Sequence, residues 1–535
     1  MFAKAKAVIR TKSFWFFMVL AVNICFLSYF CMKKTLLFVD DGLSYAVSNG
    51  SDKHMPRIKE DDICVYNPAV FHNQFTVQSD EIFQYGQITK NLEDHPPLYY
   101  FIFHAINSFF IDTFSKWTGL IFNLICFLLT QMALYALSRK FVSVQKSFLT
   151  IIFYGFSVAA VSTVVYIRSY MLLTFLTTIQ CLFALKLSEE SQKKIDKNFM
   201  KNVMWFCIIL FCGLLTHFYF LITSFILCAG VCVVLLFRRM FKKMFVFMAG
   251  CLIAVGLCPL LFHSWYIQLF EGHRTSQVSV SIYENIFHHQ FDFSVFDAFI
   301  NTDFLGHLFS DISLTLPLTI MAGIYLIWCL VRYHKINPYM VLLAVTLVFS
   351  VSIISLIMPL DIKFSGVGKR YFFNLAPLFT LLFILLIDKV TVHFKYDVYV
   401  LLILVCSLII KTYIQPDFSV YLFQKTPENK YATYLKNKTL WIKYDASISN
   451  WKMVEPALYS FWANKFIIFK DFNSDCYQNM LKDNPQLDNI ALIVENKEKS
   501  MRACKRIPEY NFIWGSWSCC MYIPKTSRDE WHSKL

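Results

Sequence analysis

Long apolar runs alternate with short polar loops over most of the chain. Eleven of these runs approach the roughly 20 residues that a helix needs to cross the hydrocarbon core of a bilayer. They cover 14–32, 118–137, 147–167, 169–187, 203–220, 221–237, 244–264, 311–331, 338–358, 371–388 and 397–414. A shorter apolar stretch, 97–111, holds 15 residues and would reach only about 22 Å as a helix, against a core of roughly 30 Å. We therefore expect about eleven crossings plus one partial or re-entrant helix that begins at the outer surface.

The Lys and Arg residues predict the orientation, because cytoplasmic loops carry an excess of them. They cluster after alternate crossings, at Arg139/Lys140/Lys146, Lys193/Lys194/Lys197/Lys201, Arg238/Arg239/Lys242/Lys243, Arg332/Lys335 and Lys389/Lys395. This alternation places the N-terminus in the cytoplasm and the C-terminus outside. No small-residue cleavage site follows the first run, so we expect a retained helix. Lys33 and Lys34, just beyond that run, depart from the rule.

Two loops and the C-terminal segment are predicted to lie outside. Loop 33–95 is acidic, and loop 265–310 has Arg274 as its only Lys or Arg. Polar residues return from 418 to 535, where short apolar runs such as 466–469 and 489–494 predict strands. We therefore expect an α-helical polytopic membrane domain over 1–417 and a small mixed α/β domain outside the membrane over 418–535.

Composition agrees with a lipid-embedded chain. Hydrophobic residues make up 57% of the 535 residues and charged residues 16%, with a mean hydropathy of +0.49. A water-soluble globule could not cover that much apolar surface. The formal net charge of +14 does not indicate a nucleic-acid partner, because the basic residues lie in loop clusters and not along one groove.

Two acidic strings border the first outer loop. The loop opens with Phe38-Val39-Asp40-Asp41-Gly42 and closes with Glu93-Asp94-His95-Pro96-Pro97-Leu98-Tyr99-Tyr100, so that each string carries an acidic pair. A carboxylate beside a membrane helix can be partly desolvated, which raises its proton affinity and suits it to general-base catalysis. The alternative for either pair is solvated surface charge, and the two prolines also fit an ordinary first helical turn.

Those strings resemble motifs of the GT-C glycosyltransferases of the protein-mannosyltransferase and aminoarabinose-transferase type. Further similar strings follow in the family's order: Tyr166-Ile167-Arg168-Ser169-Tyr170, Thr216-His217-Phe218-Tyr219, and Lys369-Arg370-Tyr371 with Pro377. The resemblance covers roughly residues 14–390. The family usually has Asp-Glu where this chain has Asp40-Asp41. Asp80-Glu81, later in the loop, is a second candidate, although it would require a long insertion.

The resemblance implies transfer of a sugar from a polyprenyl-phosphate donor to a glycan, lipid or protein acceptor at the outer membrane face. It implies Asp40 and Asp94 as catalytic residues, with Asp40 as the general base of an inverting reaction. Substrate-binding residues would be Asp41, His95, Arg168, Tyr170, His217, Arg274 and Arg370. No metal ligand is assigned, and a divalent metal ion stays open. The cations suit an anionic phosphate leaving group.

A polytopic transporter or lipid flippase of the cell envelope is the alternative from another class. Such a protein should carry ionisable residues near the bilayer midplane, often in two repeated halves. In this sequence they gather at one face, so we favour the enzyme, and we expect it in the inner membrane of a bacterium. For the C-terminal domain we expect a role in selecting the acceptor, with a simple tether as the alternative.

Overall fold

The chain is presented as a computed structural model. It describes residues 12–34, 37–50, 64–66, 72–86, 88, 95–190, 194–270, 338–357, 367–391, 396–414, 439–443, 465–469, 479, 482–483, 490–495, 510–515 and 519–524. Contacts divide the chain into two compact units. Unit 1 comprises residues 1–32, 92–99 and 120–422, and unit 2 comprises residues 33–91, 100–119 and 423–535.

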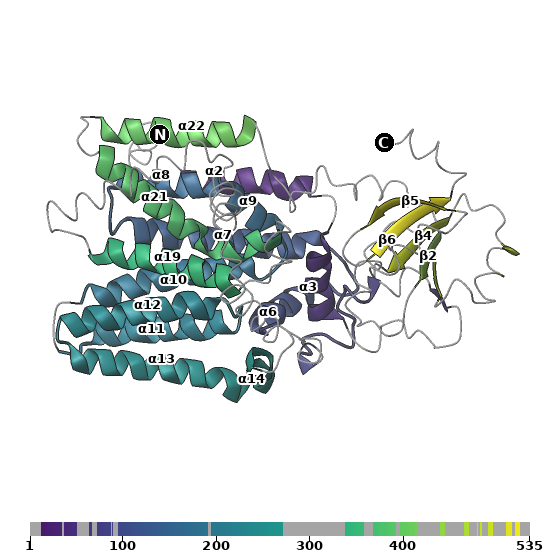
Figure 1. Cartoon of the computed structure of the whole chain (residues 1–535), viewed down its shortest axis with the longest axis horizontal. Helices are drawn as coiled ribbons and strands as arrows, with labels where there is room; N and C mark the ends of the chain where they lie inside the picture. The colour runs from purple at the N-terminus through teal and green to yellow at the C-terminus, as the bar shows by residue number, and fades with distance from the viewer. Residues whose placement is uncertain are drawn as a thin grey trace, which may run out of the picture. The chain divides into compact units, whose positions relative to one another are not determined.

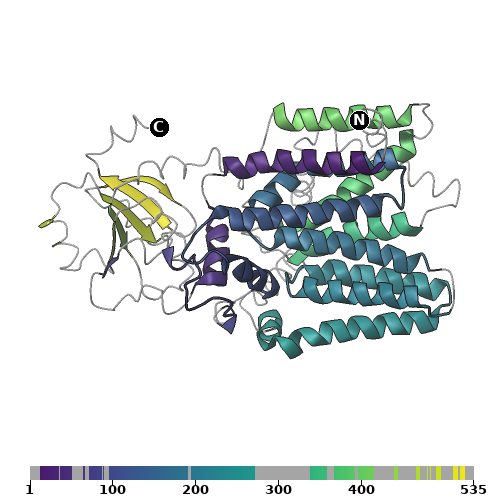
Figure 2. The same ribbon diagram turned by 180° about the vertical axis from the view of Figure 1, so that it is seen from behind.

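Unit 1 is made of helices, and the long apolar ones lie side by side (Figures 1 and 2). They are α2 (Lys12–Lys33), α7 (Lys116–Ser138), α8 (Val144–Gly155), α9 (Val158–Val165), α10 (Tyr170–Ser188), α11 (Lys197–Leu214), α12 (Phe220–Phe237), α13 (Phe241–Leu261), α14 (His263–Phe270), α19 (Pro338–Ile357), the 3₁₀ helix η2 (Val367–Leu375), α21 (Ala376–Thr391) and α22 (Asp397–Ile414). Seven of the described helices are long and apolar enough to cross a membrane, or eight if one bent pair counts as a span. The chain is therefore a multi-pass helical membrane protein. The predicted run 311–331 lies outside the described residues, and the total of eleven crossings stays a prediction.

The run 147–167, expected as one continuous span, is broken. Helices α8 and α9 meet at an angle of 54°. Ser157 caps the second helix by accepting a hydrogen bond from the backbone N–H of Ala160 at 3.1 Å, and such a cap begins a helix anew. Gly155 at the break allows close approach of α2, since a Cβ there would lie 2.5 Å from the side chain of Asn23. The break therefore arises from a local cap and a contact between helices.

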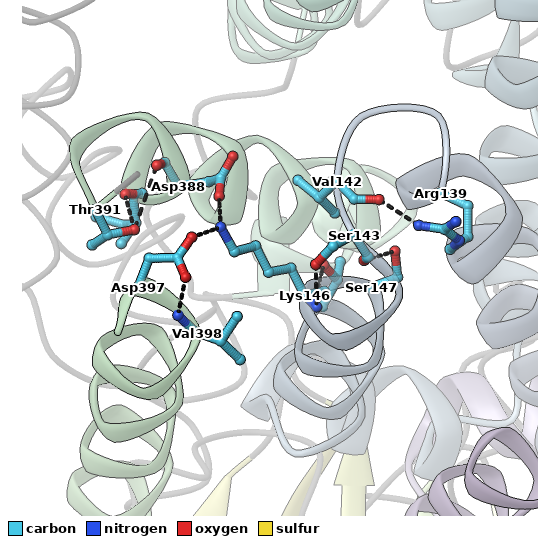
Figure 3. A network of polar contacts seen from close by, with 11 residues as sticks. Arg139, Val142, Ser143, Lys146, Ser147, Asp388, Thr391, Asp397 and Val398 are labelled. Carbon is cyan, nitrogen blue, oxygen red and sulfur yellow. Dashed lines mark hydrogen bonds and ion pairs between the residues drawn. The ribbon is translucent and has the colours of Figure 1, made fainter. Parts of the chain in front are cut away.

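Charged contacts tie the helices together at the end where the sequence predicts the cytoplasm. Lys146 of α8 pairs with Asp388 of α21 and with Asp397 of α22 (Figure 3). At the same end, Lys140 pairs with Glu189 at 2.5 Å. Lys243, which has no exposed side-chain surface, pairs with Glu190 at 2.8 Å. These pairs join the termini of helices that the sequence separates by 49 to 251 residues.

The apolar stretch 97–111 forms a short helix, α6 (Leu98–Asn107), of 10 residues. Its length is about 15 Å at 1.5 Å per residue, half of the hydrocarbon core. The prediction of a helix too short to cross is confirmed. Tyr99 and Phe103 on this helix are fully buried, so protein surrounds much of its surface.

Unit 2 combines residues 33–91, which the sequence predicts to lie outside, with a six-stranded sheet. Helix α3 (Val39–Asn49) lies in the loop. The strands are β1 (Cys64–Tyr66), β2 (Thr439–Lys443), β3 (Lys465–Phe469), β4 (Ile490–Glu495), β5 (Tyr510–Gly515) and β6 (Cys519–Pro524). Their order is β1-β3-β2-β4-β6-β5, with β2 parallel to β3 and β4 and the remaining pairs antiparallel. Two of the strands lie where the apolar runs 466–469 and 489–494 predict them. Strand β1 was not predicted, and it joins the first outer loop to the C-terminal sheet.

Candidate active site

Four segments that are distant in the sequence meet in unit 1. They are the start of α6, the α9–α10 junction, the α11–α12 junction and the helix η2. Each carries one of the candidate residues His95, Arg168, His217 and Arg370. We call this group, together with Tyr166, Tyr170, Tyr219 and Tyr371, the junction cluster. It lies at the ends of α10, α12 and α21 opposite to those that carry Glu189, Arg238 and Asp388.

Arg168 is held by the string that precedes α6. One guanidinium nitrogen lies 2.7 Å from Nε2 of His95, and Arg168 is only 7% exposed. Because a guanidinium can only donate, Nε2 of His95 accepts and the ring proton lies on Nδ1. The tight turn before α10 is fixed by a backbone hydrogen bond from Arg168 to Tyr166 at 2.8 Å. Asn123 of α7 donates to the same Tyr166 carbonyl at 2.8 Å.

Arg370 reaches the same junction from η2. It donates to the hydroxyl of Tyr166 at 2.9 Å and to that of Tyr371 at 3.3 Å. Its guanidinium carbon lies 5.2 Å from the centre of the Tyr371 ring, within the range of a cation–π interaction. Tyr166 and Arg370 are 204 residues apart in the sequence. The structure therefore brings two predicted cations to one place.

His217 completes the cluster through aromatic contacts. Its ring lies 5.3 Å from Tyr170 and 5.3 Å from Tyr219, measured between ring centroids. Tyr219 also contacts Tyr371 at 4.7 Å. The backbone N–H of Tyr219 donates to Nδ1 of His217 at 3.1 Å, so Nε2 carries the proton in the neutral ring. That geometry makes Nε2 a hydrogen-bond donor.

Three tyrosines of the cluster were not among the predicted site residues: Tyr166, Tyr219 and Tyr371. A signal for them exists, since each stands in a motif string beside a predicted cation or histidine. Sequence alone does not show that Tyr166 accepts from Arg370, because that contact depends on how α9 packs against η2. The candidates Asp94 and Arg274 lie outside the described residues.

The acidic pair 40–41 lies in unit 2, in the first turn of α3. Asp41 is fully buried and pairs with Lys34 at 2.5 Å. Asp40 is partly exposed, as is Leu43 three residues later, so both lie on one face of the helix. The other residues of α3 whose exposure is described are buried. Of the two carboxylates, Asp40 is therefore the one that a substrate can reach.

The alternative pair, Asp80-Glu81, has the same arrangement, with the first carboxylate exposed and the second buried. Asp80 is exposed in a turn, and its carbonyl accepts from the Gln84 side chain at 2.6 Å. Glu81 is only 7% exposed. His104 of α6 is also buried, and burial lowers the pKa of this histidine despite the nearby Glu81 carboxylate. Among the residues that the structure describes, no three His, Cys, Asp or Glu side chains gather as metal ligands would.

One family model matches part of the chain that carries the candidate residues. A family model described as a domain of unknown function (DUF6311) matches residues 87–289. The matched segment contains His95, Arg168 and His217 but neither Asp40 nor Arg370. No curated protein matches the sequence.

Two solved structures resemble the chain over nearly its whole length. The oligosaccharyltransferase of Archaeoglobus fulgidus, in complex with Zn and sulfate, is similar over 95% of this chain and 73% of its own, with 10% identity and a TM-score of 0.46. ArnT from Cupriavidus metallidurans, bound to undecaprenyl phosphate, is similar over 95% and 97%, with 10% identity and a TM-score of 0.47. Both are glycosyltransferases of the GT-C type that the motif strings resemble. The function proposed below rests on the residues of the chain themselves.

Proposed function

We propose that the chain is a membrane glycosyltransferase that moves a sugar from a polyprenyl-phosphate donor to an acceptor at the outer face of the membrane. The observation that supports it best is the junction cluster, in which Arg168, Arg370 and His217 meet at one end of the helices. Burying a charged side chain such as Arg168 is unfavourable unless hydrogen bonds or an opposite charge compensate it. Two guanidinium groups and one imidazole donor in one place suit a ligand that carries negative charge at the membrane surface.

The reaction assigns the cluster to the leaving group. As the acceptor oxygen forms a bond to the anomeric carbon, the bond from that carbon to the phosphate oxygen breaks. The electron pair stays on the polyprenyl phosphate. The guanidinium groups of Arg168 and Arg370 stabilise this developing charge, and Nε2–H of His217 adds a neutral donor. His95 orients Arg168, and Tyr166 and Tyr371 orient Arg370.

Asp40 takes the acceptor proton in this proposal. Its carboxylate removes the proton from the acceptor hydroxyl as the new bond forms. The acceptor oxygen attacks the anomeric carbon from the side opposite the phosphate, and this attack inverts the configuration at that carbon. Asp94 would position acceptor or donor beside His95, while Tyr170 and Arg274 would line the substrate site; Asp41, expected from the sequence to bind substrate, is fully buried against Lys34. The acceptor is a glycan, lipid or protein, and the C-terminal domain would help to select it. We place the enzyme in a bacterial inner membrane, with the N-terminus in the cytoplasm.

Mass spectrometry of envelope glycans and glycolipids, in cells with and without the protein, tests the function. We expect one sugar modification to depend on the wild-type protein. Asp40→Asn should reduce it by about 10²-fold or more, the usual contribution of a general base. Asp112→Asn is the matched control, since Asp112 is an exposed carboxylate of the same unit and should have no effect.

Two other outcomes contradict parts of the proposal. If Asp80→Asn removes the modification while Asp40→Asn does not, the catalytic motif is Asp80-Glu81. If loss of the protein only accumulates a lipid-linked sugar on the cytoplasmic leaflet, and Asp40→Asn transports it normally, the chain is a flippase. The described ion pairs among the helices of unit 1 lie at helix termini, which favours the enzyme over a transporter with charges at mid-membrane.

A further inference from the structure

The two aspartates at the start of α3 have different surroundings. The Asp41 carboxylate is completely buried and accepts from two donors through one oxygen. These are Nζ of Lys34 at 2.5 Å and the backbone N–H of Phe38 at 2.8 Å. The second contact is the carboxylate half of a capping box, which fixes where a helix begins. Asp41 therefore sets the position of the first turn of α3.

Lys34 is held both through its side chain and through its backbone carbonyl. Its ammonium group pairs with Asp41, and the side chains of the pair are 1% and 0% exposed. Its backbone carbonyl accepts from Nζ of Lys116, the first residue of α7. The pair thus connects the start of α3 to the start of the next long apolar helix. Its burial also accounts for one of the two lysines that depart from the charge rule, because Lys34 is a structural partner of Asp41.

The rest of α3 is fixed along the same face. Asp41, Tyr45 and Asn49 are spaced by four residues and so lie one above another on the helix. Tyr45 donates to the carbonyl of Ser115 at 2.8 Å. Asn49 donates to the carbonyl of Phe75 at 2.9 Å. The contacts of Asp41, Tyr45 and Asn49 fix this face of α3 against its neighbours. Asp40, one residue before Asp41, points about 100° away from that face.

We propose that Lys34 and Asp41 are positioning residues, which hold the first turn of α3 so that Asp40 presents its carboxylate to the acceptor. The inference rests on the proposed function and adds two residues to it. It gives Asp41 a role away from the substrate. Replacing a buried ion pair by neutral side chains is often tolerated by a fold, whereas removing one partner is not. Stability and positioning can therefore be separated experimentally.

The test uses the full-length protein with Lys34→Met/Asp41→Asn, which removes both charges together. Three quantities are measured: the folded amount in the membrane, binding of undecaprenyl phosphate, and the rate of the dependent glycan modification per folded molecule. We expect near-normal folding and binding but a rate lowered at least tenfold, because a displaced base loses part of its 10²–10⁴-fold contribution. Lys34→Met alone should lower the folded amount, since it strands the buried Asp41 charge.

A double variant with the wild-type rate overturns the positioning role, and so does one whose lipid binding falls as much as its rate. If the double variant does not fold, Lys116→Met replaces it, because it removes the contact to the Lys34 carbonyl from a half-buried side chain and leaves the Lys34–Asp41 pair itself unchanged. We then expect normal binding with a severalfold lower rate, and a wild-type rate contradicts the role. Lys140→Met/Glu189→Gln, a more exposed pair in unit 1, is the matched control and should leave the rate unchanged.

Asp40→Asn in the same assay separates this inference from the proposed function. If Asp40→Asn keeps the full rate, Asp40 is not the base, and that part of the proposed function is wrong together with the positioning role. If Asp40→Asn loses the rate and Lys34→Met/Asp41→Asn keeps it, only the positioning role is wrong.

Discussion

A buried guanidinium needs an acceptor, and Arg168 has one in the imidazole of His95. The His95 ring accepts through Nε2 and so fixes the direction of the guanidinium before a ligand arrives. A guanidinium that is already held in place loses little side-chain freedom when it binds an anion such as phosphate.

Arg168→Ala should therefore weaken binding of undecaprenyl phosphate by the full-length protein. Hydrogen bonds to charged groups contribute about 1.5–3 kcal/mol, so we expect a 10- to 100-fold higher dissociation constant. Purified protein titrated with the lipid measures this. Arg139→Ala is the control, because Arg139 is exposed at the opposite helix ends and should bind normally. Equal losses in both variants would mean that net charge, and not the cluster, attracts the lipid.

Single residues of the cluster were predictable only in part. Arg168, His217 and Arg370 attract attention in the sequence because charged or polar side chains beside long apolar runs need partners. Their hydrogen-bond partners could not be predicted from the sequence. Tyr166 and Arg370 are 204 residues apart, and no local pattern predicts which tyrosine accepts from which arginine. Lys34 looked like an exception to the charge rule, and only its burial against Asp41 explains it.

At the scale of elements, one lysine holds three helix ends together. Lys146 lies at the start of α8 and pairs with Asp388 near the end of α21 and with Asp397 at the start of α22 (Figure 3). Without the lysine, two carboxylates would face each other with little access to water. The continuous segment formed by η2 and α21 is thus tied to the α8–α9 pair at both ends. Lys146 of α8 binds Asp388 near the end of α21, and Arg370 of η2 donates to Tyr166 at the end of α9.

Lys146→Met should lower the free energy of unfolding by about 3 kcal/mol, near the low end for breaking a buried pair, because the three side chains are 8–26% exposed. Adding Asp388→Asn and Asp397→Asn should restore most of the loss. Thermal unfolding in detergent measures both. Lys140→Met is the matched control, since its pair with Glu189 is about one-third exposed and should contribute less than about 1 kcal/mol. Similar losses of unfolding free energy at Lys146 and Lys140 would contradict the conclusion that Lys146 holds three helix ends together.

The apolar pattern predicts the long helices well, because length and hydropathy decide what can cross a bilayer. It does not predict the break between α8 and α9, where the residues stay apolar and the Ser157 cap interrupts the helix. Strand β1 was missed for a different reason. It has three residues, and its partner β3 lies about 400 residues further along the chain, so only the fold brings Val65 beside Ile467.

At the scale of the whole molecule, the two units divide the proposed work. Every contact of the junction cluster described above lies within unit 1, whereas α3 with Asp40 and the C-terminal sheet lie within unit 2. Donor phosphate binding should therefore depend on unit 1 alone. Acceptor activation and acceptor selection should depend on unit 2, in which the first outer loop and the C-terminal segment share one sheet.

Removal of residues 423–535 should consequently change acceptor use and spare binding of undecaprenyl phosphate. The phosphate contacts stay complete, but β1 loses its partner β3 and the first outer loop loses its connection to the sheet. We expect normal lipid binding and at least a tenfold slower modification of the native acceptor. Val65→Pro is the control variant, because proline removes a ladder hydrogen bond while the C-terminal segment remains. If the shortened protein modifies the native acceptor at the full rate, the domain is only a tether. If it fails to bind the lipid, the phosphate site is not confined to unit 1.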